Sequence, residues 1–352
     1  MSSGLISVES LKSSTIRRAA WIDLCRTVAI YSVVLLHSCG APFYQYGKIP
    51  LESCLLANFL DSLVRCSVPL FVMLSGALLL RPGAKPVTFS KLARRIVKVL
   101  VPLLVWSVIY LLFVSYHGGM PVDWLSILKQ PAMYHLWFVY MIIGIYLFLP
   151  FFQVLFEAIR TRLNLQLYLL GIWLVVTCLP VYWPLPLFSV LQQTSFFGYG
   201  GYFLMGAMMA SSPTQRLPLS ILLLIFLISV LFTFGLTWRF SEQAAAPMEK
   251  AYLYFSPNVF VSVVAAFALI SRARLSEGAA KGLQWISERS FLIYFVHVLA
   301  LEFVRYSSFI AAVSRHFPMV VTILVISVAT FAMSLMAAAV IRLVPGAQRV
   351  LG

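Results

Sequence analysis

Residues 21–39 read WIDLCRTVAIYSVVLLHSC, an apolar segment long enough for a membrane helix that carries Asp23, Arg26 and His37. On an α-helix, the eleven residues from Arg26 to His37 correspond to about 1100° of rotation and roughly 16 Å of rise. These two side chains therefore share one face at different depths, and Asp23, three residues before Arg26, falls near the same face. In a bilayer such a polar stripe points into the protein, where it needs a structural or functional purpose.

The composition predicts a polytopic membrane protein. The chain has 352 residues, of which 61% are hydrophobic and 11% are charged, and its mean hydropathy is +0.94. Soluble domains carry about 25% charged residues. The net charge of +15 is explained by the Lys and Arg of cytoplasmic loops, so we expect membrane lipid around the chain and no nucleic-acid partner. The first twenty residues show no cleavable signal peptide.

The fold class that we expect is an all-α integral membrane protein with about ten transmembrane helices. A span needs roughly 20 apolar residues. The fifth and sixth of the predicted spans are the least regular, because prolines at 180, 184 and 186 and glycines at 198, 200 and 201 interrupt them. No internal repeat is visible. The ten apolar runs are 21–39, 56–80, 96–115, 134–153, 165–181, 196–211, 217–236, 254–271, 290–308 and 319–342.

The distribution of positive charge orients these spans. Lys and Arg accumulate on the cytoplasmic side of membrane proteins. With the amino terminus in the cytoplasm, 19 of the 26 Lys and Arg residues fall on the cytoplasmic side and 7 on the other side. The sequence therefore predicts ten spans with both the N and C termini in the cytoplasm.

This orientation sorts the ionisable residues by depth. Because charges are costly inside a membrane, we expect each set to share a hydrated cavity. His297 lies near mid-membrane. The inner set is basic and consists of Arg26, Arg94, Arg95 and Lys98. The outer set consists of His37, Asp61, Arg65, His135 and Glu302.

Structural roles are open for the same residues. The three cations of the third span are also consistent with cytoplasmic anchors, and Arg26 with a side chain that extends to the membrane surface. Asp61 and Arg65, four residues apart, are also consistent with a structural helix pair. His135 suits a membrane interface and His297 a hydrogen-bonded core position. Spacing alone does not decide between these readings and a functional one.

The cysteines indicate no metal site. None of the five has metal-ligand spacing, and we expect no metal and no tightly bound cofactor. Cys39 and Cys54 flank the first outer loop, where either a disulfide or two free thiols is possible.

Several segments in order resemble the membrane-bound acyltransferase 3 family, and within it the short enterobacterial O-acetyltransferases of envelope polysaccharides. The first is Asp23, Arg26 and His37, which match the family's Arg, ten residues, His signature. The other matching segments are RCSVPLFVMLSGALLL (65–80), KLARRIVKVLVPLLVW (91–106), HLWFVYMIIGIYLFLPFF (135–152), GYFLMG (201–206) and SFLIYFVH (290–297).

The resemblance implies a membrane O-acyltransferase that moves acetyl from cytoplasmic acetyl-CoA to a sugar hydroxyl of a cell-envelope glycan or a lipid-linked oligosaccharide. It implies a multi-pass protein of the bacterial inner membrane. The corresponding domains are a cytoplasmic segment 1–20, an acyltransferase 3 transmembrane domain 21–345 and a cytoplasmic tail 346–352. A succinyl donor and other acceptors stay open. The alternative function is a transporter or flippase of a glycan precursor or small anion.

The resemblance also assigns roles. His37 is the expected catalytic residue, as a general base or as a transient acetyl carrier. Arg26 contacts the donor or orients the polar stripe, and Asp23 holds Arg26. The residues expected to bind the donor or the substrate are Arg65, Ser75, Arg94, Arg95, Lys98, His135, Tyr140, His297 and Glu302.

Overall fold

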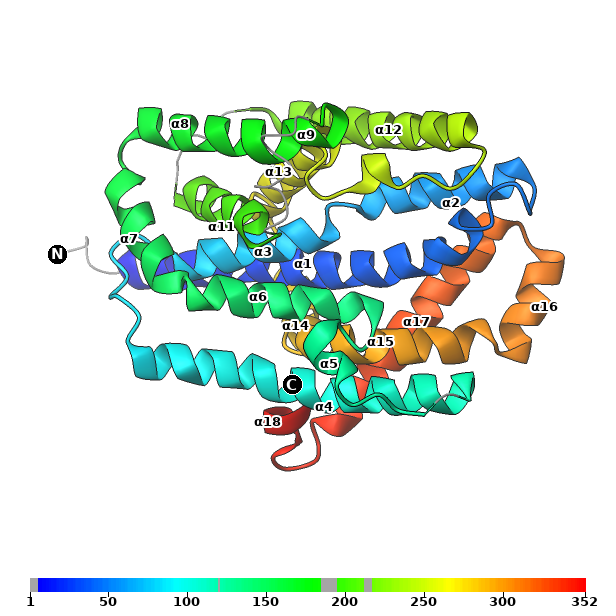
Figure 1. Ribbon diagram of the computed structural model, residues 1–352. Coiled ribbons are helices and arrows are strands. Elements are labelled where there is room, and N and C mark those ends of the chain that lie inside the picture. Colours follow the sequence, from blue (N-terminus) through cyan, green and yellow to red (C-terminus); the bar gives the residue numbers. More distant parts are fainter. Residues whose placement is uncertain (1–5, 120, 185–194, 212–216) are drawn as a thin grey trace.

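The computed structural model describes residues 6–119, 121–184, 195–211 and 217–352, and every regular element in these ranges is a helix. Arg216, one of the predicted cytoplasmic cations, lies outside the described residues. The elements, shown in Figure 1, are α1 (Ile6–Phe43), α2 (Leu51–Val64), α3 (Ser67–Leu79), α4 (Phe89–Gly118), α5 (Ser126–Lys129), η1 (Tyr134–Leu136), α6 (Trp137–Leu147), α7 (Leu149–Ile159), α8 (Leu163–Trp173), η2 (Leu174–Cys178), α9 (Leu179–Tyr182), α11 (Ser195–Ser211), α12 (Leu219–Ala244), η3 (Lys250–Tyr252), α13 (Pro257–Ser271), α14 (Glu277–Ser287), α15 (Ser290–Arg305), α16 (Ser308–His316), α17 (Met319–Ile341) and α18 (Ala347–Leu351).

The described residues contain 7 helices that are long and apolar enough to cross a membrane, or up to 9 if two bent helix pairs each count as one span. These candidates coincide with nine of the ten predicted spans. The sixth predicted span is represented by α11, which is a helix of 17 residues. The bent pairs are Tyr134–Leu147 with Leu149–Ile159, at 62°, and Ser290–Arg305 with Ser308–His316, at 65°.

Most of the long helices run side by side, and α1 lies in the middle of the bundle (Figure 1). Its neighbours are α2, α3, α13, α14, α15 and α17. This central place suits its sequence, because polar side chains inside a membrane face other helices and not lipid. We call the end of the bundle where α1 begins the near end, and the end where α1 finishes the far end.

The second predicted span is interrupted between α2 and α3. Arg65 and Cys66 separate the two helices. The cause is Pro69, which has no N–H to donate to the carbonyl of Arg65 four residues earlier. The ladder resumes with Leu70, whose N–H donates to the Cys66 carbonyl at 3.0 Å. The proline therefore places Arg65 at a break in the helix.

Two glycines bring α3 and α11 into direct backbone contact. A Cβ added to Gly76 would collide with the backbone of Phe203, and one added to Gly206 would collide with the backbone of Met73. Small residues are the usual device for close helix packing in membranes, where apolar surfaces gain little from leaving lipid. The pair α3–α11 is the most extensive helix contact in the described part of the chain.

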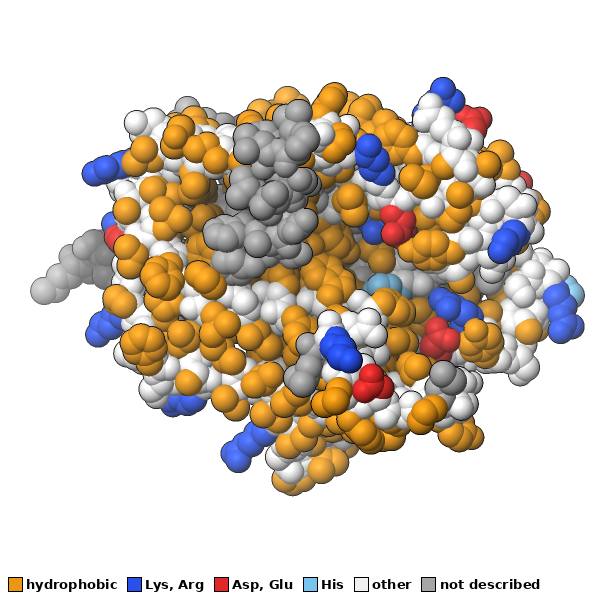
Figure 2. Space-filling view, in the orientation of Figure 1, with side chains coloured by type: hydrophobic (Ala, Val, Ile, Leu, Met, Phe, Trp, Pro, Cys, Tyr) orange, Lys and Arg blue, Asp and Glu red, His pale blue; other side chains and the backbone are white. Residues whose placement is uncertain are grey.

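The outside of the bundle suits a bilayer. Hydrophobic side chains cover most of the visible face, whereas charged side chains gather toward the two ends (Figure 2). Large apolar residues on α4, α8 and α12 are exposed, including Leu112, Tyr168 and Phe232. Exposed apolar surface of this extent is expected where lipid is the solvent.

Candidate functional site

Three of the five histidines of the chain meet near the far end of the bundle. His37 comes from α1, His135 from η1 and His297 from α15. The rings of His37 and His297 stack with centroids 5.3 Å apart, and the ring of His135 meets that of His297 edge-on at 5.0 Å. His135 and His297 are buried, whereas His37 is half-buried. A histidine is also visible in a hollow of the face shown in Figure 2.

The tautomer of His297 follows from its hydrogen bond. Its Nδ1 lies 2.6 Å from the backbone carbonyl of Tyr294. A carbonyl only accepts, so Nδ1 carries the proton and Nε2 of the neutral ring keeps a lone pair. Among the described residues, Nε2 has no hydrogen-bond partner. His297 therefore presents a basic nitrogen beside His37.

Two tyrosines complete the histidine group. Tyr134 places its ring 5.1 Å from that of His37. Tyr294 donates its hydroxyl proton to the backbone carbonyl of His135. Both ring nitrogens of His135 lack a partner within the described residues. Buried polar atoms are normally satisfied, so these nitrogens leave unused hydrogen-bonding capacity within the histidine group.

The ion pair of Glu302 and Arg305 supports His37 from α15. Arg305 Nη1 lies 3.2 Å from Glu302 Oε1, and Arg305 Nη2 donates to the backbone carbonyl of His37 at 3.4 Å. This contact links the last turn of α15 to α1 at the level of the histidine. Three members of the predicted outer set, His37, His135 and Glu302, therefore lie in one region. His297, which the sequence predicts near mid-membrane, joins them.

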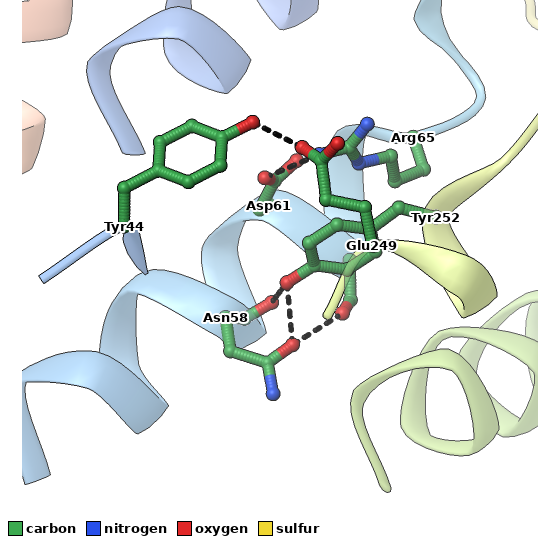
Figure 3. Close-up of polar contacts among 7 residues, drawn as sticks. Tyr44, Asn58, Asp61, Arg65, Glu249 and Tyr252 are labelled. Atoms are coloured by element: carbon green, nitrogen blue, oxygen red, sulfur yellow. Dashed lines mark hydrogen bonds and ion pairs between the residues drawn. The ribbon is translucent and has the colours of Figure 1, made fainter. Parts of the chain in front are cut away.

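Asp61 and Arg65 form the ion pair that their spacing predicts. Arg65 Nη2 lies 2.6 Å from Asp61 Oδ2. The Arg65 guanidinium lies 3.9 Å from the centre of the Tyr252 ring, and that ring packs against Phe43 at the end of α1 with centroids 5.2 Å apart. Figure 3 shows this pair together with Tyr44 and Glu249. The pair therefore belongs to the same far-end region as the histidines.

The inner set is partly brought together at the near end. The charges of Arg26 and Arg95 both reach the phenol of Tyr146 on α6. Arg94 instead donates to its own helix at Ser90, and the side chains of Arg94, Arg95 and Lys98 are exposed. The cations of α4 lie at its near end, well separated along the bundle from the histidine group (Figure 1).

The family model of the acyltransferase domain, acyltransferase 3, matches residues 19–339, which is nearly the whole chain. The chain belongs to the acyltransferase 3 family. It is a multi-pass membrane acyltransferase, and the resemblance seen in the sequence is confirmed. Neither the curated proteins nor the solved structures give a match.

One contact expected in this acyltransferase differs from the structure. Among the described residues there is no ion pair between Asp23 and Arg26. Arg26 Nη1 instead donates to Ser287 Oγ at 3.5 Å, a residue of α14 that the tertiary fold brings against α1. The helical spacing of Asp23 and Arg26 allows contact, but the neighbouring helix supplies the partner.

Two candidates lie apart from the histidines. Ser75 donates to the Phe71 carbonyl within its own helix at 2.8 Å. Tyr140 is exposed and donates to the Ile127 carbonyl at 3.4 Å. Among the described residues neither side chain contacts the histidine group, and their roles stay predictions.

Sequence reasoning missed the aromatic residues of the site. Tyr134 adjoins His135, and Tyr294 stands one helical turn before His297, so their positions carried a signal. No sequence signal marked Tyr44, Tyr252 and Glu249, because only the packing of separate segments brings them beside Asp61.

The cysteines of the acyltransferase are free thiols. All five are buried and unbridged, Cys39 and Cys54 included. The Cys54 thiol donates to the Pro42 carbonyl at 3.7 Å. Of the two possibilities for the first outer loop, the structure therefore has free thiols. Within the described residues no three His, Cys, Asp or Glu side chains converge as metal ligands, since the histidines meet by their ring faces and edges.

Proposed function

We propose that this chain is an O-acyltransferase that transfers acetyl from cytoplasmic acetyl-CoA to a sugar hydroxyl of a cell-envelope glycan or a lipid-linked oligosaccharide. The observation that carries the proposal is the helix α1, which holds a cation, Arg26, near one end of the bundle and His37 within a histidine group near the other. About 16 Å of helix separates the two residues. A donor that enters from one end can therefore contact Arg26, and an acceptor that enters from the other end can contact His37 on the same helix.

The membrane topology is part of the proposal. The nine candidate spans together with α11 make ten, and the near end is then the cytoplasmic side of a bacterial inner membrane. The links from α3 to α4 and from α7 to α8 lie at this end (Figure 1). They carry Arg81, Lys85 and Arg160. Lys and Arg in short loops favour this orientation.

The near-end cations suit the donor. Acetyl-CoA is polyanionic, and guanidinium groups bind phosphates through charge-assisted hydrogen bonds. Arg95 is exposed at the near end, and its charge reaches Tyr146, as does that of Arg26. Arg95 then meets the phosphates, and Arg26 lies deeper, toward the acyl group. Transfer of acetyl from acetyl-CoA to a hydroxyl group needs no further cofactor.

His37 supplies the base. Its imidazole removes the proton from the sugar hydroxyl as the oxygen attacks the thioester carbonyl. The bond from the carbonyl carbon to sulfur breaks, and the CoA thiolate leaves and receives the proton. The Nε2 lone pair of His297 beside His37 offers a second acceptor for this proton. The alternative, in which His37 carries the acetyl group, uses the same residues.

The test is the replacement His37→Ala with analysis of surface glycans by NMR and mass spectrometry. We expect loss of an O-linked acetyl group at a normal protein level. His117→Ala is the matched control, because this exposed histidine bonds to its own helix at Phe113. Glycans that keep full acetylation in His37→Ala cells would overturn the proposal. A flippase would move its substrate without any covalent change.

A further inference from the structure

A second group of polar side chains adjoins the histidines at the far end. It consists of Asp61, Arg65, Tyr44, Glu249 and Tyr252, and we call it the outer polar cluster (Figure 3). Asp61 lies in α2 and Arg65 directly follows this helix. Glu249 and Tyr252 come from the segment between α12 and α13. The cluster therefore forms only when these segments pack against the end of α1.

The ion pair at its centre has unused hydrogen-bonding capacity. The side chain of Asp61 is 2% exposed and that of Arg65 is 11% exposed. Their single contact joins Asp61 Oδ2 to Arg65 Nη2, and neither Asp61 Oδ1 nor Arg65 Nε has a partner among the described residues. Buried atoms of this kind are costly unless a ligand satisfies them. One buried acceptor and one buried donor of the same ion pair are thus left unpartnered.

Arg65 is held in place by an aromatic support. Its guanidinium lies 3.9 Å from the centre of the Tyr252 ring. Tyr252 is itself buried and donates its hydroxyl proton to Asn58 Oδ1 at 2.6 Å. This arrangement fixes the direction of the guanidinium before any ligand arrives, and preorganised groups lose less entropy on binding.

Tyr44 and Glu249 form the outer rim. The Tyr44 hydroxyl donates to the Glu249 carboxylate, and both side chains are exposed. Partial burial and this hydrogen bond raise the pKa of Tyr44 above its ordinary value, so the phenol stays a donor at neutral pH. The Glu249 charge also reaches Asp61.

The charge of the cluster selects against anions. It contains two carboxylates, Asp61 and Glu249, and one guanidinium, Arg65. The neighbouring Lys250 places its ammonium over the rings of Tyr182 and Phe240, at 5.9 and 5.7 Å. Glu302 and Arg305 neutralise each other. Within the cluster itself an acidic ligand would meet two carboxylates and one guanidinium, because Lys250 forms no ion pair with Asp61 or Glu249 among the described residues. A hydroxyl group both donates and accepts and so matches Oδ1 and Nε.

We propose that the outer polar cluster is the acceptor subsite and that it binds a neutral sugar through two neighbouring hydroxyl groups, one donating to Asp61 Oδ1 and one accepting from Arg65 Nε. The inference rests on the proposed function and adds the class of sugar. The ring of Tyr252 lies 5.2 Å from that of Phe43 at the end of α1, and α2 packs along α1. A further hydroxyl of the same sugar then meets His37, while Glu249 at the rim rejects acidic sugars.

The test measures sugar binding without catalysis. Saturation-transfer NMR titrations of the purified full chain use methyl hexopyranosides of gluco, galacto and manno configuration and the corresponding uronic acids. We expect wild type to bind at least one neutral sugar about tenfold more tightly than its uronic acid, as loss of one charged contact is worth roughly that factor. Asp61→Asn weakens binding of the neutral sugar about tenfold.

Two further variants make the result specific. Glu249→Gln removes a charge at the rim, so the affinity ratio between the neutral sugar and its uronic acid should become smaller. The ion pair between Arg65 and Asp61 stays intact. Glu242→Gln is the matched control, because Glu242 forms an exposed pair with Arg239 outside the cluster. Its binding equals that of wild type.

Three outcomes would overturn the subsite: no binding of any neutral sugar, equal binding of neutral and acidic sugars, or unchanged binding in both Asp61→Asn and Glu249→Gln. Failure of the proposed function looks different. In that case sugars bind with the expected preference, but glycans from cells with and without the protein carry the same acetylation.

Discussion

The imidazole rings of His37 and His297 stack at a centroid distance of 5.3 Å and an interplanar angle of 28°. His297 turns its protonated Nδ1 to the Tyr294 carbonyl, so its Nε2 is the free basic nitrogen. The pair joins α1 to α15 in the middle of the site. Its chemistry and the packing around it lead to the following predictions.

The variant His297→Asn distinguishes the roles of the two ring nitrogens of His297. The Asn amide keeps a donor for the Tyr294 carbonyl but has no basic nitrogen at the Nε2 position. We expect kcat to fall about 100-fold, the usual scale of acid–base assistance, with unchanged thermal stability and an unchanged KM for acetyl-CoA. The measurement is transfer of labelled acetyl in membranes. Full activity of His297→Asn would leave His297 a purely structural residue.

His37 as a base predicts no acetylated enzyme. Membranes given labelled acetyl-CoA without acceptor should contain no label on the protein after a mild, rapid quench. An acetyl carrier instead accumulates label in the first turnover. Label that appears in wild type and disappears in His37→Ala would establish the carrier route.

The two neighbouring arginines of α4, Arg94 and Arg95, should contribute differently to the KM for acetyl-CoA. Arg94 is bonded to Ser90 of its own helix, whereas the exposed side chain of Arg95 has no hydrogen bond among the described residues. We expect Arg95→Glu to raise KM for acetyl-CoA about tenfold, the scale of one charge-assisted contact, and Arg94→Glu to raise it less. Both effects should shrink in high salt, which screens exposed charges. If both variants change the KM only slightly and to the same extent, the two arginines act as cytoplasmic anchors of the helix and not as a donor site.

The glycine contacts between α3 and α11 should be sensitive to one methyl group. Gly76→Ala and Gly206→Ala place a Cβ against backbone atoms of the facing helix, which cannot rotate away. We expect a loss of about 1–3 kcal/mol of stability, seen as a lower melting temperature in detergent.

Gly235→Ala is the control for these glycines, because a Cβ there meets nothing within 4 Å. Alanine is the better helix former by about 1 kcal/mol, so its melting temperature should be unchanged or higher. Equal melting of all three variants would contradict the close packing of α3 and α11.

The free thiols are directly testable. Denatured without reductant in the presence of an alkylating agent, the chain should take up a label on each of its five cysteines. Prior reduction should change nothing in the mass spectrum. Uptake on three cysteines, with Cys39 and Cys54 unlabelled, would instead reveal a disulfide.

The sequence predicted the helices well because a membrane span is a local property. Length and apolarity identify each segment, and the ion pair of Asp61 and Arg65 follows from spacing of four on one helix. The break at Arg65 could also be read from Pro69. The partner of Arg26 could not, because Ser287 of α14 reaches α1 only after the helices pack.

By itself, the sequence determined the apolar helices, their order and the polar stripe of α1, since periodicity and hydropathy act within a segment. Tertiary structure alone decided that His37, His135 and His297 share one site, that Tyr252 supports Arg65, and that Cys39 and Cys54 stay apart. The reason is physical. These residues lie on different helices, and helix packing, which depends on side-chain shape over the whole bundle, sets which faces meet.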